Sequence, residues 1–414
     1  MPANTTRKRV RALYLQPAPL FGGAERQAAL AAALLPQFGV DVIPLVGPGR
    51  VIADWLRECG VRDIHETRYF PGGWKKQEGL RRATLPYRYV DCGLRARAEI
   101  QSLVTEERVD IILASLPFAW ITGSLVARQA KIPIVWRAGG THLNVAQQAA
   151  LWGLTRFQQP DLLLCNSEAV KATFSPLVPA PVEVVPNGID ERRFHPGAGD
   201  PGKYRPRGAV QVVGCAMRLA EAKRPRDFVA LAAALAVRRP EVQLLLAGEG
   251  SQRAELEQMA RQSGAHNLTF LGFVADMPSF YAACDVLVLP SSSEGCSNFV
   301  LEATALGKPV VVADIPPLLE LVAATRNAVC FELGNVAALV AAVSQLLGEP
   351  ERLAALGAQA LAHADRFSAR ATAARIAALL RPLVLERRRK PSPSPAKPLP
   401  PSRRGPDDME LLAK

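Results

Sequence analysis

Two glutamates eight positions apart form the most chemistry-rich part of the chain. Glu294 and Glu302 follow the apolar run Leu287-Val288-Leu289-Pro290, which is typical of a buried strand that ends in a loop and then a helix. The free backbone N–H groups and positive end of such a helix suit a phosphate, and Ser297 or Asn298 can cap it. Glu294 is then free to bond a sugar hydroxyl, and Glu302 is placed for vicinal hydroxyls such as those of a ribose. The alternative is a capped helix with two solvated acids.

A second pair of residues carries positive charge. Arg218 follows the apolar run Val210 to Ala216, and Lys223 lies five residues later. A departing nucleoside diphosphate gathers negative charge, which a guanidinium and an ammonium group can neutralise without a metal ion. The chain contains no Asp-x-Asp motif, which favours protein cations over a magnesium-bound donor. An isolated pair of this kind is more typical of ordinary surface residues.

Glycines mark a third candidate phosphate contact, and other nucleotide signatures are absent. Gly22 and Gly23 precede a helix-like stretch, where they let the backbone approach a phosphate or sugar closely; alone they would be only a turn. Gly307-Lys308 is followed by proline, so no P-loop is present, and no complete Gly-x-Gly-x-x-Gly follows a strand. ATPase and dehydrogenase functions are therefore disfavoured.

The spacing of these residues resembles the signature of glycosyltransferase family 4, two glutamates separated by seven residues. The resemblance implies a GT-B fold in which Glu294 contacts the donor sugar and Glu302 the nucleotide ribose. It also implies that Arg218 and Lys223 take the place of the family's Arg and Lys pair, although Arg224 stands where a glycine is usual. The further donor contacts that it implies are Gly22, Gly23, Gly295, Cys296, Ser297 and Asn298. The Ser297-Asn298 pair matches a variant common among polysaccharide-type members.

Other matches follow in the same order between about residue 10 and residue 367. Gly22-Gly23-Ala24-Glu25-Arg26 resembles the family's donor-facing loop, and Asn187-Gly188-Ile189-Asp190 resembles the close of the first domain, with a turn or hinge role. Many members carry a histidine at the end of a first-domain strand, facing the donor, and that position falls near Gly139 here. Either His142 or Arg137 could fill this role, and a structural histidine is the remaining alternative.

The resemblance implies a retaining, metal-independent transferase. It would move a sugar from a nucleotide-diphosphate donor to a hydroxyl of a lipid-linked or polysaccharide acceptor, with no cofactor and no nucleic acid partner. The leaving diphosphate would help to deprotonate the acceptor. Because we see no well-placed carboxylate nucleophile, we expect a front-face route rather than double displacement. The alternatives are a nucleotide-sugar isomerase such as a UDP-N-acetylglucosamine 2-epimerase, and a non-catalytic binding module.

The elements that position these residues alternate regularly. Six short runs rich in Val, Ile and Leu alternate with amphipathic stretches in residues 1–195, which predicts a parallel sheet. Turn formers and basic residues follow, and the alternation then restarts at Val210. We therefore expect an α/β fold of two tandem Rossmann-like domains, residues 1–195 on the acceptor side and 196–368 for the nucleotide sugar, with a helix over 369–386 crossing back to the first domain.

Composition and charge agree with an ordinary globular enzyme. The 414 residues are 49% hydrophobic and 21% charged, which excludes a disordered chain or a fibre. The net charge of +12 is uneven: it is +7 over residues 1–195, zero over 196–386 and +5 over 387–414. The basic, proline-rich segment 387–414 is expected to be a disordered tail.

The remaining expectations concern the location of the protein in the cell. Seven cysteines without a Cys-x-x-Cys pair predict neither a disulfide framework nor a zinc site and fit a reducing cytosol. The uncharged stretch Ile111 to Ala127 is too broken for a membrane span and is expected to be a strand and a helix, and Pro17 and Pro19 argue against a signal peptide. Basic and aromatic residues mix between Tyr69 and Tyr89, which suits a membrane interface, at the inner face of the plasma membrane, or an anionic lipid-linked acceptor. Single-stranded nucleic acid and a plain exposed loop are the alternatives.

Overall fold

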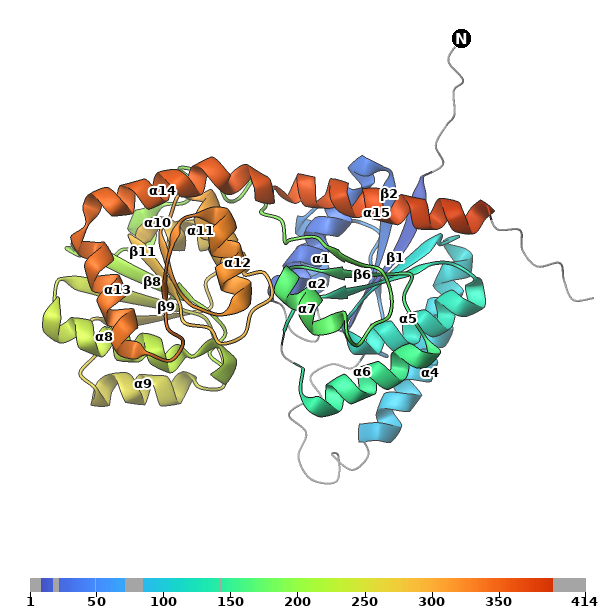
Figure 1. Cartoon of the computed structure of the whole chain (residues 1–414), viewed down its shortest axis with the longest axis horizontal. Coiled ribbons are helices and arrows are strands. Elements are labelled where there is room, and N and C mark those ends of the chain that lie inside the picture. Colours follow the sequence, from blue (N-terminus) through green and yellow to red (C-terminus); the bar gives the residue numbers. More distant parts are fainter. Residues whose placement is uncertain (1–8, 18–21, 49, 71–84, 142, 390–414) are drawn as a thin grey trace, which may run out of the picture.

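Two parallel sheets, each covered by helices on both faces, form two lobes that lie side by side (Figure 1). The computed structural model describes residues 9–17, 22–48, 50–70, 85–141 and 143–389. Every strand pairing in these residues is parallel. The predicted α/β class with two Rossmann-like units is therefore confirmed.

The first lobe contains a seven-stranded sheet in the order β3-β2-β1-β4-β5-β6-β7. Its strands are β1 (Val10–Gln16), β2 (Val40–Val46), β3 (His65–Glu66), β4 (Ile111–Ser115), β5 (Ile134–Ala138), β6 (Leu162–Cys165) and β7 (Val182–Val184). Its helices are α1 (Gly23–Leu34), α2 (Arg50–Glu58), α4 (Leu85–Glu106), α5 (Leu116–Ala130), α6 (Val145–Phe157) and α7 (Glu168–Phe174), with a 3-10 turn η1 (Leu35–Phe38) after α1.

The second lobe contains a six-stranded sheet in the order β10-β9-β8-β11-β12-β13. Its strands are β8 (Gln211–Ala216), β9 (Val242–Ala247), β10 (Leu268–Gly272), β11 (Val286–Leu289), β12 (Val310–Ala313) and β13 (Ala328–Phe331). Its helices are α8 (Pro225–Arg238), α9 (Arg253–Gln262), α10 (Met277–Ala283), α11 (Asn298–Ala305), α12 (Pro316–Thr325), α13 (Val336–Gly348) and α14 (Pro350–Ala364), with 3-10 turns η3 (Pro201–Lys203), η4 (Glu221–Lys223) and η5 (Asp365–Phe367).

Each sheet is buried on both faces, which explains why its strands are nearly continuous apolar runs. Along β1, Ala12 and Tyr14 enter the core beneath α1 and α2, whereas Leu13 and Leu15 enter the core beneath α4 and α5. In parallel sheets the carboxyl ends of the strands gather at one edge, so the loops that follow the strands meet there. This edge of each sheet carries the candidate site residues.

The chain passes between the lobes at two neighbouring points. Ile189 pairs with Ser368 in a parallel bridge, and a Cβ on Gly188 would lie only 2.5 Å from the Cα of Ala369, so the two crossings are in close contact. The long helix α15 (Ala369–Arg389) then lies along the first lobe (Figure 1). Its buried side chains in the core of that lobe are Ala373, Ile376, Ala377, Leu380 and Val384.

The last turn of α15 contains three arginines that the sequence predicted to belong to the disordered tail. Arg387, Arg388 and Arg389 are helical, and Arg388 forms a 2.6 Å ion pair with Asp110 at the start of β4. The arginine run is therefore partly helix rather than tail, because acidic side chains of the first lobe face it. The segment from residue 390 lies outside the described residues.

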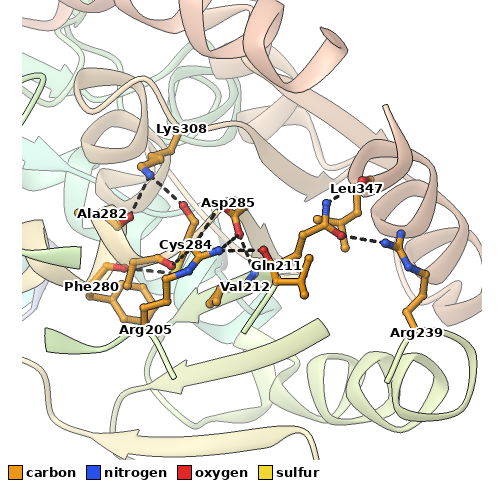
Figure 2. Close-up of polar contacts among 12 residues, drawn as sticks. Arg205, Gln211, Val212, Arg239, Phe280, Ala282, Cys284, Asp285, Lys308 and Leu347 are labelled. Atoms are coloured by element: carbon orange, nitrogen blue, oxygen red, sulfur yellow. Dashed lines mark hydrogen bonds and ion pairs between the residues drawn. The ribbon is translucent and has the colours of Figure 1, made fainter. Parts of the chain in front are cut away.

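The segment that connects the lobes, residues 190–210, is fastened near the start of β8 in the second sheet (Figure 2). The Arg205 guanidinium donates to Asp285, whose carboxylate also accepts the backbone N–H of Val212 in β8. Lys308 donates to the carbonyls of Ala282 and Cys284 at the end of α10, and burial lowers the pKa of its ammonium group. These bonds give partners to the free carbonyls at the end of α10 and to a backbone N–H near the start of β8. The segment that contains Arg205 therefore leaves the second lobe from a fixed point.

The sequence located most elements, and the exceptions have physical causes. The stretch Ile111 to Ala127 forms β4 and most of α5, as predicted, and no helix in the described residues has the length and apolarity to cross a bilayer. The two-residue strand β3 is too short to give a sequence pattern. Helix α6 likewise gives no apolar stripe that the sequence could reveal, because several of its large apolar residues face solvent.

Candidate active site

The loop after β11 carries Glu294 directly onto Lys223. The Lys223 ammonium donates to the Glu294 carboxylate at 2.7 Å and to the carbonyl of Ser293 at 3.0 Å. The hydroxyls of Ser291 and Ser292 both bond the carbonyl of Ala222, which precedes the lysine. The two predicted residues, 71 positions apart, are therefore held together, and Glu294 is paired with a cation instead of standing free.

Arg218 faces the start of α1 across the cleft between the lobes. A Cβ on Gly22 would lie 3.6 Å from a guanidinium nitrogen of Arg218 and 3.1 Å from a carboxylate oxygen of Glu25, so this glycine lies directly beside both charged groups. The Arg218 side chain is exposed, and it has no hydrogen-bond or ion-pair partner in the part of the chain that the structure describes. Its guanidinium is therefore available to an anion.

Glu25 is a buried acid at the same edge, and sequence reasoning gave it no role of its own. Its carboxylate accepts a 3.2 Å hydrogen bond from Gln16 at the end of β1. Burial raises the pKa of Glu25, while backbone N–H groups at the start of α1 and the nearby Arg218 charge act in the opposite direction. The first lobe thus places a carboxyl group opposite the Arg218 guanidinium.

Glu302 lies inside α11, where it is buried and shared between the lobes. One carboxylate oxygen accepts a 3.1 Å bond from Arg26 of α1, and the other accepts a 2.8 Å bond from the hydroxyl of Tyr281 in α10. Burial raises the pKa of Glu302, opposed chiefly by the Arg26 charge. Each oxygen keeps a further lone pair for a hydroxyl donor, so this arrangement still suits the vicinal diol expected from the sequence.

Asn298 connects α11 to the first lobe through all of its side-chain groups. Its carbonyl oxygen accepts from Gln27 at 3.2 Å and from Asn187 at 2.9 Å, and its amide nitrogen donates to the carbonyl of Gly23 at 3.2 Å. Gln27 in turn exchanges two 2.8 Å bonds with the backbone of Gly188. We call Gln27, Asn187 and Asn298 the amide clasp.

The capping role predicted for this loop is wrong. Ser297 occupies the N-cap position of α11, but its hydroxyl makes no capping bond, and Asn298 is the first helical residue with its side chain turned to the other lobe. The carbonyl of Cys296 accepts a 2.8 Å bond from Asn187, and burial raises the pKa of the Cys296 thiol to about 12, so that thiol stays neutral at physiological pH. Because neither Ser297 nor Asn298 caps the helix, the first backbone N–H groups of α11 have no side-chain cap.

The two lobes touch near Gly139, the position at which the family resemblance predicts a histidine. A Cβ on Gly295 would lie 2.2 Å from the carbonyl oxygen of Gly139, and Thr141 donates a 3.2 Å bond to the carbonyl of Glu294. His142 lies outside the described residues. The other candidate, Arg137, donates to the hydroxyl of Tyr14 and lines a small cavity together with Gln27 of α1 and Gly188.

A cleft between α1, residues 188–194 and α11 contains several of these groups together with residues that the sequence did not single out. Its lining includes Arg26, Trp55, Arg193, Asn298 and Glu302. The guanidinium groups of Arg26 and Arg193 both stack on the Trp55 ring, at 5.7 and 4.8 Å from its centroid. No spacing in the sequence predicts that Trp55 contacts these arginines or that Tyr281 bonds Glu302. Within the described residues, no group of three or more His, Cys, Asp and Glu side chains could hold a metal ion.

Glu320 forms a further interlobe contact on the other side of the cleft. Its carboxylate, on α12, accepts the backbone N–H groups of Glu168 at 2.9 Å and Ala169 at 3.2 Å, in the first turn of α7. An anion at this position satisfies two orphan donors and the positive end of the helix. Nothing in the sequence pairs α12 with α7, because the contact exists only once the lobes are arranged.

Comparison with known proteins agrees with this architecture. The profile of Glycosyltransferase Family 4 matches residues 21–193, and that of Glycosyl transferases group 1 matches residues 201–363. The chain is similar to D-inositol 3-phosphate glycosyltransferase of Segniliparus rotundus, 33% identical over 47% of this chain and 45% of that protein. It is also similar to the lipopolysaccharide core biosynthesis mannosyltransferase LpsB of Rhizobium meliloti, 28% identical over 56% of this chain and 69% of that one.

Solved structures extend the likeness to the whole fold. HepE of Anabaena in complex with UDP superposes with a TM-score of 0.73 over 90% of this chain and all of that one, at 23% identity. Sucrose-phosphate synthase of Thermosynechococcus elongatus superposes with a TM-score of 0.76 at 16% identity, over 91% of this chain and all of that one. The chain spans less than half the length of the Segniliparus rotundus relative. The two profiles, the fold and the ordered glutamates together show that this chain belongs to glycosyltransferase family 4, with the GT-B fold.

Proposed function

We propose that the protein transfers a sugar from a nucleotide-diphosphate sugar to an acceptor hydroxyl, with retention of the anomeric configuration and without a metal ion. One observation carries this proposal. The adjacent glycines Gly22 and Gly23 face Arg218 and Asn298 respectively, so the unpaired guanidinium and the amino end of α11 lie at the same loop. Lys223 lies on the same lobe edge, against Glu294.

These groups suit a leaving diphosphate. Arg218 offers a forked donor and Lys223 a point charge, and the uncapped N–H groups of α11 add the positive end of a helix. Charge that develops on the diphosphate is then stabilised by groups that are already in place. Glu294 would bond a hydroxyl of the donor sugar, and Glu302 would accept from the ribose diol.

The proposed bond changes take place on one face of the sugar. The bond between the anomeric carbon and the phosphate oxygen breaks, and a bond to the acceptor oxygen forms on the same side. The acceptor proton passes to the leaving phosphate oxygen. In this route no protein carboxylate becomes covalently attached to the sugar.

The acceptor is proposed to be a lipid-linked sugar or a growing glycan. The chain is similar to an inositol-phosphate and a lipopolysaccharide-core transferase, and its neighbours among solved structures include complexes with UDP and UDP-glucose. A UDP-sugar is therefore the first donor to test. We also propose a location at the inner face of the plasma membrane.

The test is a panel of UDP- and GDP-sugars incubated with and without lipid-linked and glycan acceptors. Release of nucleoside diphosphate that depends on an acceptor, with an α-linked product from an α-linked donor by NMR, is the expected result. Arg218→Met and Lys223→Met should each reduce turnover by about 10²- to 10³-fold. Arg238→Met, an exposed arginine on α8, is the matched control and should leave turnover unchanged.

Three outcomes would replace or narrow the proposal. An epimerised nucleotide sugar formed from donor alone would identify the isomerase, which needs no acceptor. An inverted product would keep the transferase and remove the retaining assignment. Full biological activity in Lys223→Met would favour a binding module.

A further inference from the structure

Exposed apolar side chains of the first lobe gather on one of its faces. The structure records seven large ones in the described part of that lobe, and all seven belong to three successive helices, α4, α5 and α6. They are Leu94, Leu116, Ile121, Leu125, Val145, Trp152 and Phe157. In the second lobe and α15 the corresponding residues are scattered over separate elements, Val210, Val237, Phe273, Leu319, Leu361 and Leu385. We call the first set the α4–α6 face.

The α4–α6 face is continuous because its helices cover the same side of the sheet (Figure 1). Arg97 of α4 bonds Gln129 of α5 at 3.0 Å, and Gly93 packs against Thr122, so Leu94 lies between two points where these helices touch. Arg128, Lys131 and Phe157 line one groove, which joins the end of α5 to the end of α6. Asp161 lies in the same groove, where it forms a 3.5 Å ion pair with Arg387.

The most exposed residues lie on α6. Val145 and Phe157 are each 82% exposed and Trp152 is 50% exposed. Val145, Trp152 and Arg156 recur at spacings of seven and four residues, which places them on one stripe of the helix. The Arg156 guanidinium lies over the Trp152 ring, 4.4 Å from its centroid. Trp152 and Phe157 are thus exposed to water, and exposed apolar patches of this kind are typical of interaction surfaces.

The acids of the α4–α6 face, Asp91, Glu99 and Glu106, all lie on α4, so the charge on α5 and α6 has one sign. Neither α5 nor α6 contains an acidic residue. Arg128, Lys131 and Arg156 are exposed and have no carboxylate partner among the residues that the structure describes. Apolar anchors flanked by unpaired cations complement an anionic lipid surface, where cations meet headgroups and a tryptophan lies at the boundary. A protein partner would need to supply the acids that α5 and α6 lack.

The face also adjoins the active-site cleft. Helix α6 begins seven residues after the end of β5, and the connecting segment contains Gly139 and Thr141, which touch Gly295 and Glu294 of the donor loop. A surface bound through α6 therefore lies at the first-lobe side of the cleft, where an acceptor held in a membrane can enter.

We propose that the α4–α6 face docks the enzyme on an anionic membrane, with Trp152 and Phe157 inserted and Arg128, Lys131 and Arg156 at the headgroups. This inference deepens the proposed function, because it names the surface on which a lipid-linked acceptor is met. It is also testable without donor or acceptor. Failure of vesicle binding would leave sugar transfer standing, and failure of sugar transfer would leave vesicle binding standing.

The experiment is flotation of the full chain with vesicles of phosphatidylcholine, alone or with 30% phosphatidylglycerol (about one lipid in three anionic). We expect at least about tenfold more protein on anionic vesicles, falling as salt screens the charges. Trp152→Ser/Phe157→Ser should reduce the bound fraction at least about tenfold, and Arg128→Glu/Arg156→Glu should remove the anionic preference. Val210→Ser/Val237→Ser is the matched control, since Val237 is 85% exposed on the other lobe, and it should bind like wild type.

Brominated lipids separate this face from the basic segment near the carboxyl end. Quenching of tryptophan fluorescence on vesicles should be strong in wild type and largely lost in Trp152→Phe. Absence of vesicle binding by wild type, or quenching unchanged in Trp152→Phe, would overturn the proposal. A dimer of the free protein that Trp152→Ser/Phe157→Ser dissolves, with vesicle binding unaltered, would also overturn it and assign the face to a second copy of the chain.

Discussion

Loss of the Gln27 amide should loosen the junction of the two lobes more than any single surface change. Gln27→Met keeps the length of the side chain and removes its three hydrogen bonds, two with Gly188 and one with Asn298. Gln27 and Gly188 are both buried. Because the N–H and the carbonyl of Gly188 lose this partner in a water-poor site, we expect a cost of about 2–6 kcal/mol, at about 1–3 kcal/mol for each group.

Asn298→Leu should cost less, because its partners keep other bonds. Asn187 still donates to Cys296 and Gln27 still bonds Gly188, whereas the carbonyl of Gly23 loses its bond from Asn298. We expect about 1–3 kcal/mol. The bond between Gln27 and Asn298 is lost in both single variants, so the double variant should be more stable than the sum of the two predicts, by about 1 kcal/mol.

Urea unfolding followed by two probes measures this coupling. All five tryptophans lie between residues 55 and 152, so their fluorescence reports the first lobe, whereas circular dichroism reports both lobes. Asn335→Ala removes the cap of α13, remote from the clasp, at a cost of about 1 kcal/mol. This control should combine additively with Gln27→Met. If Gln27→Met and Asn298→Leu also add to within about 0.5 kcal/mol, the clasp does not act as a unit and our reasoning is wrong.

Three further predictions concern the cleft. Gly295→Ala should reduce kcat/KM by about 10²-fold, since its Cβ would displace the Gly139 carbonyl and a displacement of about 1 Å at an active site has that effect; wild-type turnover with an unchanged melting temperature would contradict it. Burial raises the pKa of Glu25, so its folded form binds a proton more strongly than its unfolded form, and stability that is present at acidic pH is lost as pH rises through the folded pKa. Glu25→Gln should therefore be more stable than wild type at pH 7 and no more stable at pH 4, and calorimetric melting curves at the two pH values decide this. Glu320→Gln should weaken the anionic cap of α7 by about 0.5–2 kcal/mol; amide exchange at the first turn of α7 should rise, and unchanged protection would refute the capping role.

Local pattern was sufficient for the fold class and for the neighbourhood of the site. Short Val-, Ile- and Leu-rich runs that alternate with amphipathic stretches can bury both faces of a strand only in a parallel sheet, and parallel strands bring the segments around Arg218, Lys223 and Glu294 to one edge. The pairing of Lys223 with Glu294 and the placement of Gly22 against Arg218 agree with that expectation. The roles of these residues in catalysis stay predictions.

Only the tertiary structure decided how the second lobe meets the first. Arg26 and Glu302 are 276 residues apart, and the bonds of Asn298 to Gln27 and Asn187 span 271 and 111 residues. No periodicity encodes such contacts, because they depend on the relative position of two separately folded sheets. The same is true of the space that requires glycine at Gly295, and of the α4–α6 face. An exposed tryptophan looks like a core residue in the sequence, and only its neighbours in space show that water surrounds it.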